Sequence, residues 1–130
     1  MVKGSSPRPT DAELEILRVL WQRGPSTVRE VQESLNETKL TGYTTVLKLM
    51  QIMTDKGLVR RDESERAHVY EARLPQEQTQ RQMVHDLLER VFNGSATSLV
   101  MHALATKKKT SSSELSEIRR ILDEFERGNK

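Results

Sequence analysis

The chain has 130 residues, enough for one domain of ordinary size or two small ones, and its aromatic content of 4% favours two small cores. A formal net charge of +2 does not by itself establish a nucleic-acid partner. The absence of cysteine excludes disulfides, thiolate metal sites and cysteine nucleophiles. No stretch approaches the ~20 apolar residues of a membrane span and the N-terminus lacks an apolar signal core, so we expect a cytoplasmic protein without a membrane partner.

Residues 1–9 are rich in Gly, Ser and Pro and predict a disordered tail. A first helix follows, because Thr10 and Glu13 form a T-x-x-E capping box and Gly24-Pro25 provides a stop signal. Its apolar side, which we expect in the core, consists of Leu14, Leu17, Leu20 and Trp21.

A short second helix is predicted by a repeat of the capping box at Thr27 and Glu30. Its buried side is expected to contain Val28, Val31 and Leu35. Ser26 and Thr27 also suit a small strand, and the polar run at residues 36–38 turns the chain.

Residues 41–56 (TGYTTVLKLMQIMTDK) predict a third helix, which Gly57 ends. Apolar residues recur at i, i+3, i+4 and i+7 and form one stripe, namely Val46, Leu49, Met50 and Met53. The opposite face holds Thr44, Lys48 and Gln51, whose hydroxyl, ammonium and amide groups are suited to reading DNA. Most helices with such a face are simply solvated, so the neighbouring elements decide the interpretation.

Two short extended patterns, residues 58–62 and 67–72, predict a β-hairpin. Arg60, Arg61 and Arg66 place positive charge on or near its tip, within reach of a DNA backbone, whereas Glu63 and Glu65 would repel phosphate. Three helices followed by this hairpin are in the order of a winged helix-turn-helix, which we assign to residues 10–74 as the DNA-binding domain.

A second lobe is expected over residues 75–126, with helices over residues 76–92, from Ser95 or Thr97 onward, and from the capping box of Ser111 and Glu114 onward. Helices of ~10 to 17 residues enclose little core, so we interpret the lobe as a dimerisation domain. The alternative is a helical cap that folds back on its own domain. The residues expected in the dimer interface are Val84, Leu88, Leu99, Val100, Leu104, Leu115, Ile118, Leu122 and Phe125. Residues 127–130 are expected to form a tail.

Five motifs carry a family resemblance: AELEILRVLW at residues 12–21, TTV at 44–46, DKGLV at 55–59, VYEA at 69–72 and SLV at 98–100. With these in this order, the chain resembles the penicillinase-repressor and methicillin-resistance-regulator family of bacterial winged-helix repressors. The resemblance implies a mainly α fold with a small β-hairpin wing, and a homodimer that binds a two-fold symmetric operator, often of resistance genes. It also places Tyr43, Thr44, Thr45 and Lys48 at the DNA, although the helical pattern puts Thr45 nearer the buried side and therefore favours a phosphate contact.

The sequence departs from the family pattern at two places. Members that obey a membrane-bound sensor protease are cut at an Asn-Phe bond, and the aligned pair here is His102-Ala103. We expect that pair in a packed helix and expect no release of the repressor by cleavage there. Copper-responsive members carry a cysteine-rich C-terminal tail, whereas residues 126–130 contain no cysteine, which excludes copper sensing by thiolates.

The sequence leaves three other classes of function to consider: an enzyme, a metal sensor and a protein-interaction module. The chain has three histidines, His68, His85 and His102, which form no recognisable catalytic constellation. We therefore expect no enzymatic activity, no cofactor and no metal site. Between an enzyme and a metal sensor that uses these histidines, the sequence favours the metal sensor slightly. A protein-interaction module without operator binding is the stronger alternative, because winged helices also serve as docking domains. The residues expected at a double-stranded DNA operator are Tyr43, Thr44, Thr45, Lys48, Gln51, Arg60 and Arg66.

Overall fold

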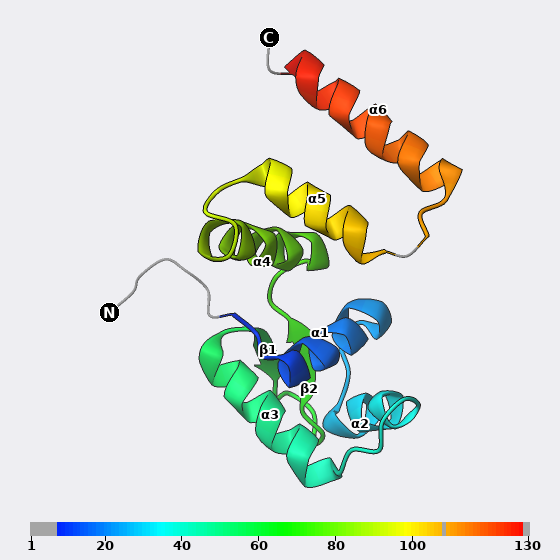
Figure 1. Cartoon of the computed structure of the whole chain (residues 1–130). Helices are drawn as coiled ribbons and strands as arrows, with labels where there is room; N and C mark the ends of the chain where they lie inside the picture. The colour runs from blue at the N-terminus through cyan, green and yellow to red at the C-terminus, as the bar shows by residue number, and fades with distance from the viewer. Residues whose placement is uncertain (1–7, 108, 129–130) are drawn as a thin grey trace. The chain divides into compact units, whose positions relative to one another are not determined.

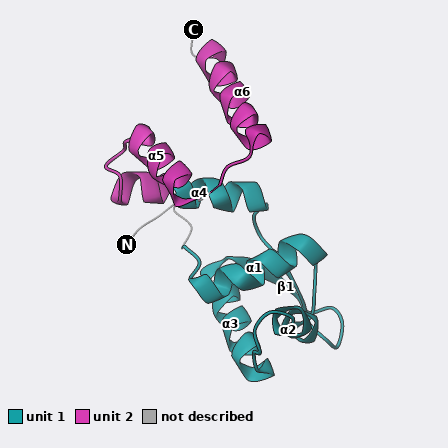
Figure 2. Ribbon diagram, turned by 45° about the vertical axis from the view of Figure 1, so that its right-hand side comes forward, with its two compact units in different colours: residues 1–84 teal, residues 85–130 magenta. Residues whose placement is uncertain are grey.

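A computed structural model describes residues 8–107 and 109–128, which form six helices and one two-stranded sheet (Figure 1). The chain divides into two compact units, the first ending at Val84 and the second beginning at His85 (Figure 2). The sequence suggests a domain boundary after Leu74, whereas the units divide later, within helix α4 (Gln76–Arg90). The expected N-terminal tail lies mostly outside the described residues.

Helix α1 (Asp11–Arg23) begins at the expected capping box. The Thr10 hydroxyl accepts a hydrogen bond from the backbone N–H of Glu13 at 3.2 Å, and the Glu13 carboxylate accepts one from the N–H of Thr10 at 2.9 Å. Gly24 follows the helix with a φ of 90°, a conformation that residues with side chains rarely adopt. The buried side of the helix consists of Ile16, Leu17 and Leu20.

Two residues of the predicted apolar side of α1 lie less deep than expected. Leu14 and Trp21 are only half-buried, while Ile16 is fully buried. The indole N–H of Trp21 donates to the carbonyl of Leu74 at 3.0 Å, which is the kind of polar partner that a partly buried indole requires. Trp21 therefore lies against the edge of the core and not at its centre.

Helices α2 (Val28–Asn36) and α3 (Tyr43–Lys56) complete the helix-turn-helix. The Thr27–Glu30 capping box starts α2, as predicted. Helix α3 begins at Tyr43, directly after its N-cap residue Gly42, and Gly57 ends it in the left-handed conformation at φ 82°.

The core of the first unit is formed by the three helices and the hairpin (Figure 1). Its buried hydrophobic residues are Ile16, Leu17, Leu20, Val28, Val31, Val46, Met50, Met53, Leu58, Val59 and Tyr70. Leu35 and Leu49, both predicted in the core, are partly buried and pack against it. Full burial of such side chains contributes about 1.5 to 3 kcal/mol each, so this cluster fixes the orientation of α3.

Strands β1 (Val59–Asp62) and β2 (Val69–Ala72) pair antiparallel. Ser26 extends this sheet, because its N–H donates to the Tyr70 carbonyl at 2.9 Å and the Tyr70 N–H donates to the Ser26 carbonyl at 2.8 Å. The predicted small strand thus reduces to Ser26, since Thr27 caps α2 instead. The elements and their order are those of a winged helix-turn-helix, as the sequence predicts.

The second unit contains the end of α4, helix α5 (Ala96–Thr106) and helix α6 (Ser112–Gly128). Asn93 and Gly94, at φ 50° and 80°, make the left-handed turn that separates α4 from α5. Neither α5 nor α6 has a buried residue. Helix α6 continues to Gly128, so Arg127 is helical and not part of a tail as predicted.

Candidate nucleic-acid interface

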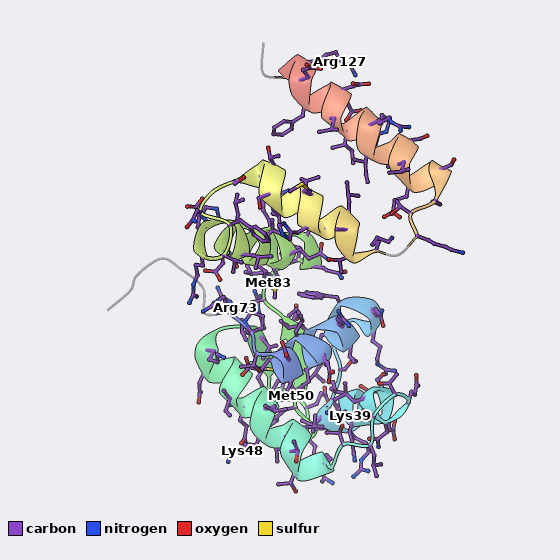
Figure 3. All side chains as sticks on the ribbon, in the orientation of Figure 1. Lys39, Lys48, Met50, Arg73, Met83 and Arg127 are labelled. Atoms are coloured by element: carbon purple, nitrogen blue, oxygen red, sulfur yellow. The ribbon has the colours of Figure 1, made fainter. Side chains whose placement is uncertain are left out.

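Helix α3 has one buried and one open side. Val46, Met50 and Met53 are fully buried, which fixes the rotation of the helix about its axis. Figure 3 shows Lys48 extending away from the body of the first unit while Met50 points into it. The predicted reading residues Thr44, Lys48 and Gln51 are exposed.

Thr45 differs from its predicted position. The helical pattern places it nearer the buried side, whereas its side chain is exposed. Residue 45 is about 100° around the helix from Val46 and so lies beyond the side that packs on the core of the first unit. Thr45 therefore belongs to the open surface of α3, beside Thr44 and Lys48.

The N-terminus of α3 is open to ligands. Its N-cap residue, Gly42, has no side chain to accept a hydrogen bond from the first-turn N–H groups. Tyr43 is the first helical residue, is 42% exposed, and lies under the guanidinium of Arg29 from α2, with Cζ 5.5 Å from the ring centroid. The sequence pattern does not identify Arg29 as a site residue, because no local spacing connects it to α3 and only the fold brings it to Tyr43.

The loop between α2 and α3 is braced by hydrogen bonds. The Thr41 N–H donates to Oδ1 of Asn36 at 2.8 Å, and Nε2 of Gln32 donates to the Thr41 carbonyl at 3.2 Å. The loop leaves Lys39 exposed and Leu40 89% exposed just before α3. Lys39 therefore adds positive charge near the start of α3, a contribution that a sequence pattern for a turn does not reveal.

One acidic residue of the hairpin, Glu63, forms an ion pair with Arg61 of strand β1. Nε of Arg61 lies 2.6 Å from the Glu63 carboxylate, so Glu63 is paired and does not simply repel phosphate as expected. The pKa of Arg61 is raised above its ordinary value by a hydrogen bond with Tyr70 and by the charge of Glu63. Arg60 and Arg66, the predicted wing contacts, remain exposed.

Several cations of the first unit have no carboxylate partner among residues 8–107 and 109–128. Ion pairs occupy Arg23, Lys56 and Arg61, which bind Glu30, Glu13 and Glu63 respectively. Among the described residues, the unpaired cations of α2, α3, the loop between them and the wing are Arg29, Lys39, Lys48, Arg60 and Arg66. An unpaired cation can bind a phosphate without first breaking an ion pair, so the surface of α2, α3 and the hairpin is suited to a polyanion.

The metal-ligating side chains form no cluster in the described part of the chain. No group of three or more His, Asp or Glu residues there is close enough to hold a metal ion. His102 instead lies inside α5, with Nδ1 2.8 Å from the Ser98 carbonyl and its ring 5.5 Å from that of Phe92. Over the same residues, no helix is both long and apolar enough to span a membrane.

The residues predicted in the dimer interface differ in their exposure. Leu88, Leu99, Leu115 and Ile118 are half-buried. Val84, Val100, Leu104, Leu122 and Phe125 are exposed, Phe125 to 70%. The single chain thus leaves large apolar side chains of α5 and α6 in contact with water.

The pair aligned with the family's cut site is less protected than predicted. His102 and Ala103 lie within α5, as expected, but both are exposed in the single chain. One chain alone does not bury this helix, because Val100 and Leu104, both predicted in the dimer interface, are 49% and 36% exposed.

These features define a winged helix-turn-helix protein with exposed, unpaired cations on α2, α3 and the hairpin. The sequence profile of the penicillinase repressor family matches residues 9–124. The chain is 27% identical over 124 residues to the penicillinase repressor of Bacillus licheniformis, covering 95% of this chain and 96% of that one. It is 31% identical over 121 residues to the transcriptional regulator BlaI of Mycobacterium tuberculosis, covering 92% of this chain and 86% of the relative.

The solution structure of the DNA-binding domain of the repressor BlaI is also similar. It superposes with a TM-score of 0.50 at 25% identity and covers 55% of this chain and 88% of that domain. The chain belongs to the penicillinase repressor family, whose members are transcriptional repressors with a winged-helix DNA-binding domain.

Proposed function

We propose that this protein is a homodimeric repressor that binds a two-fold symmetric DNA operator, with one α3 helix in the major groove of each half-site. The observation that carries the proposal is the open surface of α3, where Thr44, Lys48 and Gln51 are exposed above a fully buried stripe. Occupation of an operator blocks transcription from the neighbouring promoter. Operators of resistance genes, in the bacterial cytoplasm, are the targets that we propose.

Each contact has a distinct role in this arrangement. Thr44, Lys48 and Gln51 face the base edges, since hydroxyl, ammonium and amide groups bind the donors and acceptors of the major groove. Tyr43 and Thr45, at the start of α3, bind the phosphate backbone, supported by the free first-turn N–H groups of the helix. Arg60 and Arg66 of the wing add phosphate contacts and fix the orientation of the domain. Residues 10–74 form this DNA-binding domain.

The second copy binds through residues 75–126. Helix α6 presents Leu115, Ile118, Leu122 and Phe125 at intervals of three, four and three, the spacing of a helix seam. No side chain of α5 or α6 is fully buried within one chain, so much of their apolar surface is available to a partner. An isologous contact between two copies covers it and relates the two α3 helices by a two-fold axis.

Salt dependence tests the proposal against a protein-docking role for the winged helix. The probe is a duplex selected from a random-sequence pool by the full-length protein, with an unrelated duplex of equal length for comparison. The selected duplex should bind more tightly, and the logarithm of its affinity should fall steeply with the logarithm of salt concentration, because phosphate contacts release counterions. Failure to select any duplex, or affinity that does not respond to salt, would contradict the proposal and favour a protein partner.

A further inference from the structure

The position of Arg29 is not explained by the stability of α2. Arg29 is the second residue of α2 (Val28–Asn36), where the positive end of the helix dipole disfavours a cation. Glu33, one turn further on, is an available carboxylate, yet the two form no ion pair within the described residues. The Arg29 guanidinium lies instead over the ring of Tyr43, with Cζ 5.5 Å from the ring centroid. The contact thus joins an exposed cation of α2 to the first residue of α3.

This contact leaves hydrogen-bonding groups of both residues unused. A cation–π contact uses the charge of the guanidinium and the face of the ring, so the N–H groups of Arg29 remain donors. Neither Arg29 nor the Tyr43 hydroxyl has a hydrogen-bond partner within residues 8–107 and 109–128. Both residues are exposed, Tyr43 to 42%. A guanidinium and a phenol side by side therefore offer several donors to one anionic group.

We propose that Arg29 and Tyr43 together bind a single phosphate of the DNA backbone at the entry of α3 into the major groove. This inference rests on the proposed DNA-binding function and adds Arg29 to its contacts. A phosphate is favoured over a base, because the first helix of a helix-turn-helix crosses the backbone while the second enters the groove. Arg binds phosphate through two parallel N–H donors, and Tyr supplies a further O–H donor. The pair sets the register of α3 on DNA and carries no base preference of its own.

The first experiment measures binding of full-length Arg29→Ala as a function of salt. The probes are a duplex selected by the wild-type protein from a random pool and an unrelated duplex of the same length. We expect affinity for both to fall by a similar factor, about tenfold, and the salt slope to decrease by about 0.9 for each copy bound. Arg127→Ala, which removes the same charge from the end of α6, is the matched control and should keep the wild-type slope.

The second experiment locates the phosphate. Each phosphate of the selected duplex is replaced in turn by a neutral methylphosphonate. Several replacements should weaken binding of the wild-type protein. One of them in each half-site, at the phosphate that Arg29 binds, should cause no further loss with Arg29→Ala. Tyr43→Phe, which keeps the ring and removes the hydroxyl, should reduce the effect of the same replacement. Arg29→Lys should retain the salt slope and lose part of the affinity, since an ammonium lacks the bidentate geometry.

The outcomes separate this inference from the function on which it rests. If the wild-type protein selects no duplex, the proposed function fails. If the wild-type protein binds its duplex while Arg29→Ala shows the same affinity and slope, only the phosphate contact is overturned. If Arg29 and Tyr43 respond to different phosphates, the two residues do not act on one group. Circular dichroism of Arg29→Ala, whose side chain is exposed, checks that the fold is retained.

Discussion

Lys48 is the residue of α3 whose removal should be most informative, because its exposed ammonium has no carboxylate partner in the described chain. If Lys48 contacts a base, Lys48→Ala should weaken operator binding by about 1 to 3 kcal/mol per half-site and relax specificity at one position. If it contacts a phosphate, binding should weaken on all sequences and the salt slope should fall. Titration of selected and unrelated duplexes distinguishes the two results. Lys109→Ala, outside the first unit, is the control, and equal behaviour of the two variants would exclude Lys48 from the interface.

Glu13 is a buried carboxylate that joins the start of α1 to the end of α3. Its Oε1 lies 2.7 Å from Nζ of Lys56, and the residue is 2% exposed. Burial raises the pKa of Glu13, but the hydrogen bond and charge of Lys56 and the backbone N–H of Thr10 together outweigh it and lower the pKa below its ordinary value near 4.5. A lowered folded-state pKa contributes stability that is present above the unfolded-state pKa and is lost as the pH falls through the folded-state value.

Glu13→Gln tests this pair, because a Gln side chain keeps the capping-box acceptor and removes the charge. At pH 7 the variant should unfold about 1 to 3 kcal/mol more easily than the wild type, the usual contribution of a hydrogen bond between charged groups. Urea unfolding at fixed protein concentration should show this difference shrinking as the pH falls below about 4.5. Glu33→Gln, on the exposed side of α2, should differ little from the wild type at either pH. A difference for Glu13→Gln that persists unchanged in acid would contradict the role of the ion pair.

At the scale of elements, short sequence motifs predicted the boundaries of helices and strands better than they predicted contacts between these elements. The capping boxes and Gly57 located α1, α2 and the end of α3, because these signals act within four residues of one another. The apolar period of α3 identified its buried stripe, although it placed Thr45 too near the core. The spacing of apolar residues predicts which side of a helix faces the core, whereas the packing of neighbouring elements determines how much of the helix surface is buried.

The features that the sequence did not reveal depend on distant parts of the chain. Glu13 is a capping residue in the sequence and a buried ion-pair partner in the fold, because Lys56 approaches from α3. Arg29 meets Tyr43 only through the packing of α2 on α3. Sequence motifs thus predicted the winged helix-turn-helix and the exposed residues of α3. The contacts between residues distant in sequence became apparent only in the three-dimensional structure.

Helix α5 bears on how the repressor is released. We expect no release by cleavage at His102-Ala103, because Ala in place of the family's Phe forfeits about 2 to 3 kcal/mol of apolar burial in a protease pocket. The bond also lies within α5, so the helix must open locally before a protease reaches its backbone, even though both side chains are exposed. Mass spectrometry of the 14.9 kDa chain in cells treated with candidate inducers, including a β-lactam, measures this.

The matched control restores the family's pair by combining His102→Asn with Ala103→Phe. In cells that contain a sensor protease of the family type, this double variant should be cut while the natural sequence stays whole. Fragments of the natural protein that end at His102 and start at Ala103, appearing as target genes turn on, would refute the prediction.

For the whole molecule, we predict a dimer through residues 75–126, because one chain leaves the apolar seam of α6 uncovered. Leu122 and Phe125 are 60% and 70% exposed, and burial of such a side chain contributes about 1.5 to 3 kcal/mol. Sedimentation of the full chain should show a dimer at micromolar concentration, and Leu122→Glu with Phe125→Glu should shift it to monomer. Ser116→Glu adds a charge on the other side of α6 and should leave the dimer intact.

The same variants connect assembly to DNA binding. A two-fold dimer places its α3 helices on half-sites about one helical turn of DNA, or a multiple of it, apart. The monomeric variant keeps the exposed surface of α3 unchanged, so it should bind one half-site with the affinity of a single wild-type domain. It should lose the large gain in affinity that the dimer obtains by binding two half-sites at once. Footprinting of wild type and variant on one selected duplex measures both effects. A monomeric wild-type chain at micromolar concentration, or undiminished protection of both half-sites by the double variant, would rule out this interface as the basis of operator recognition.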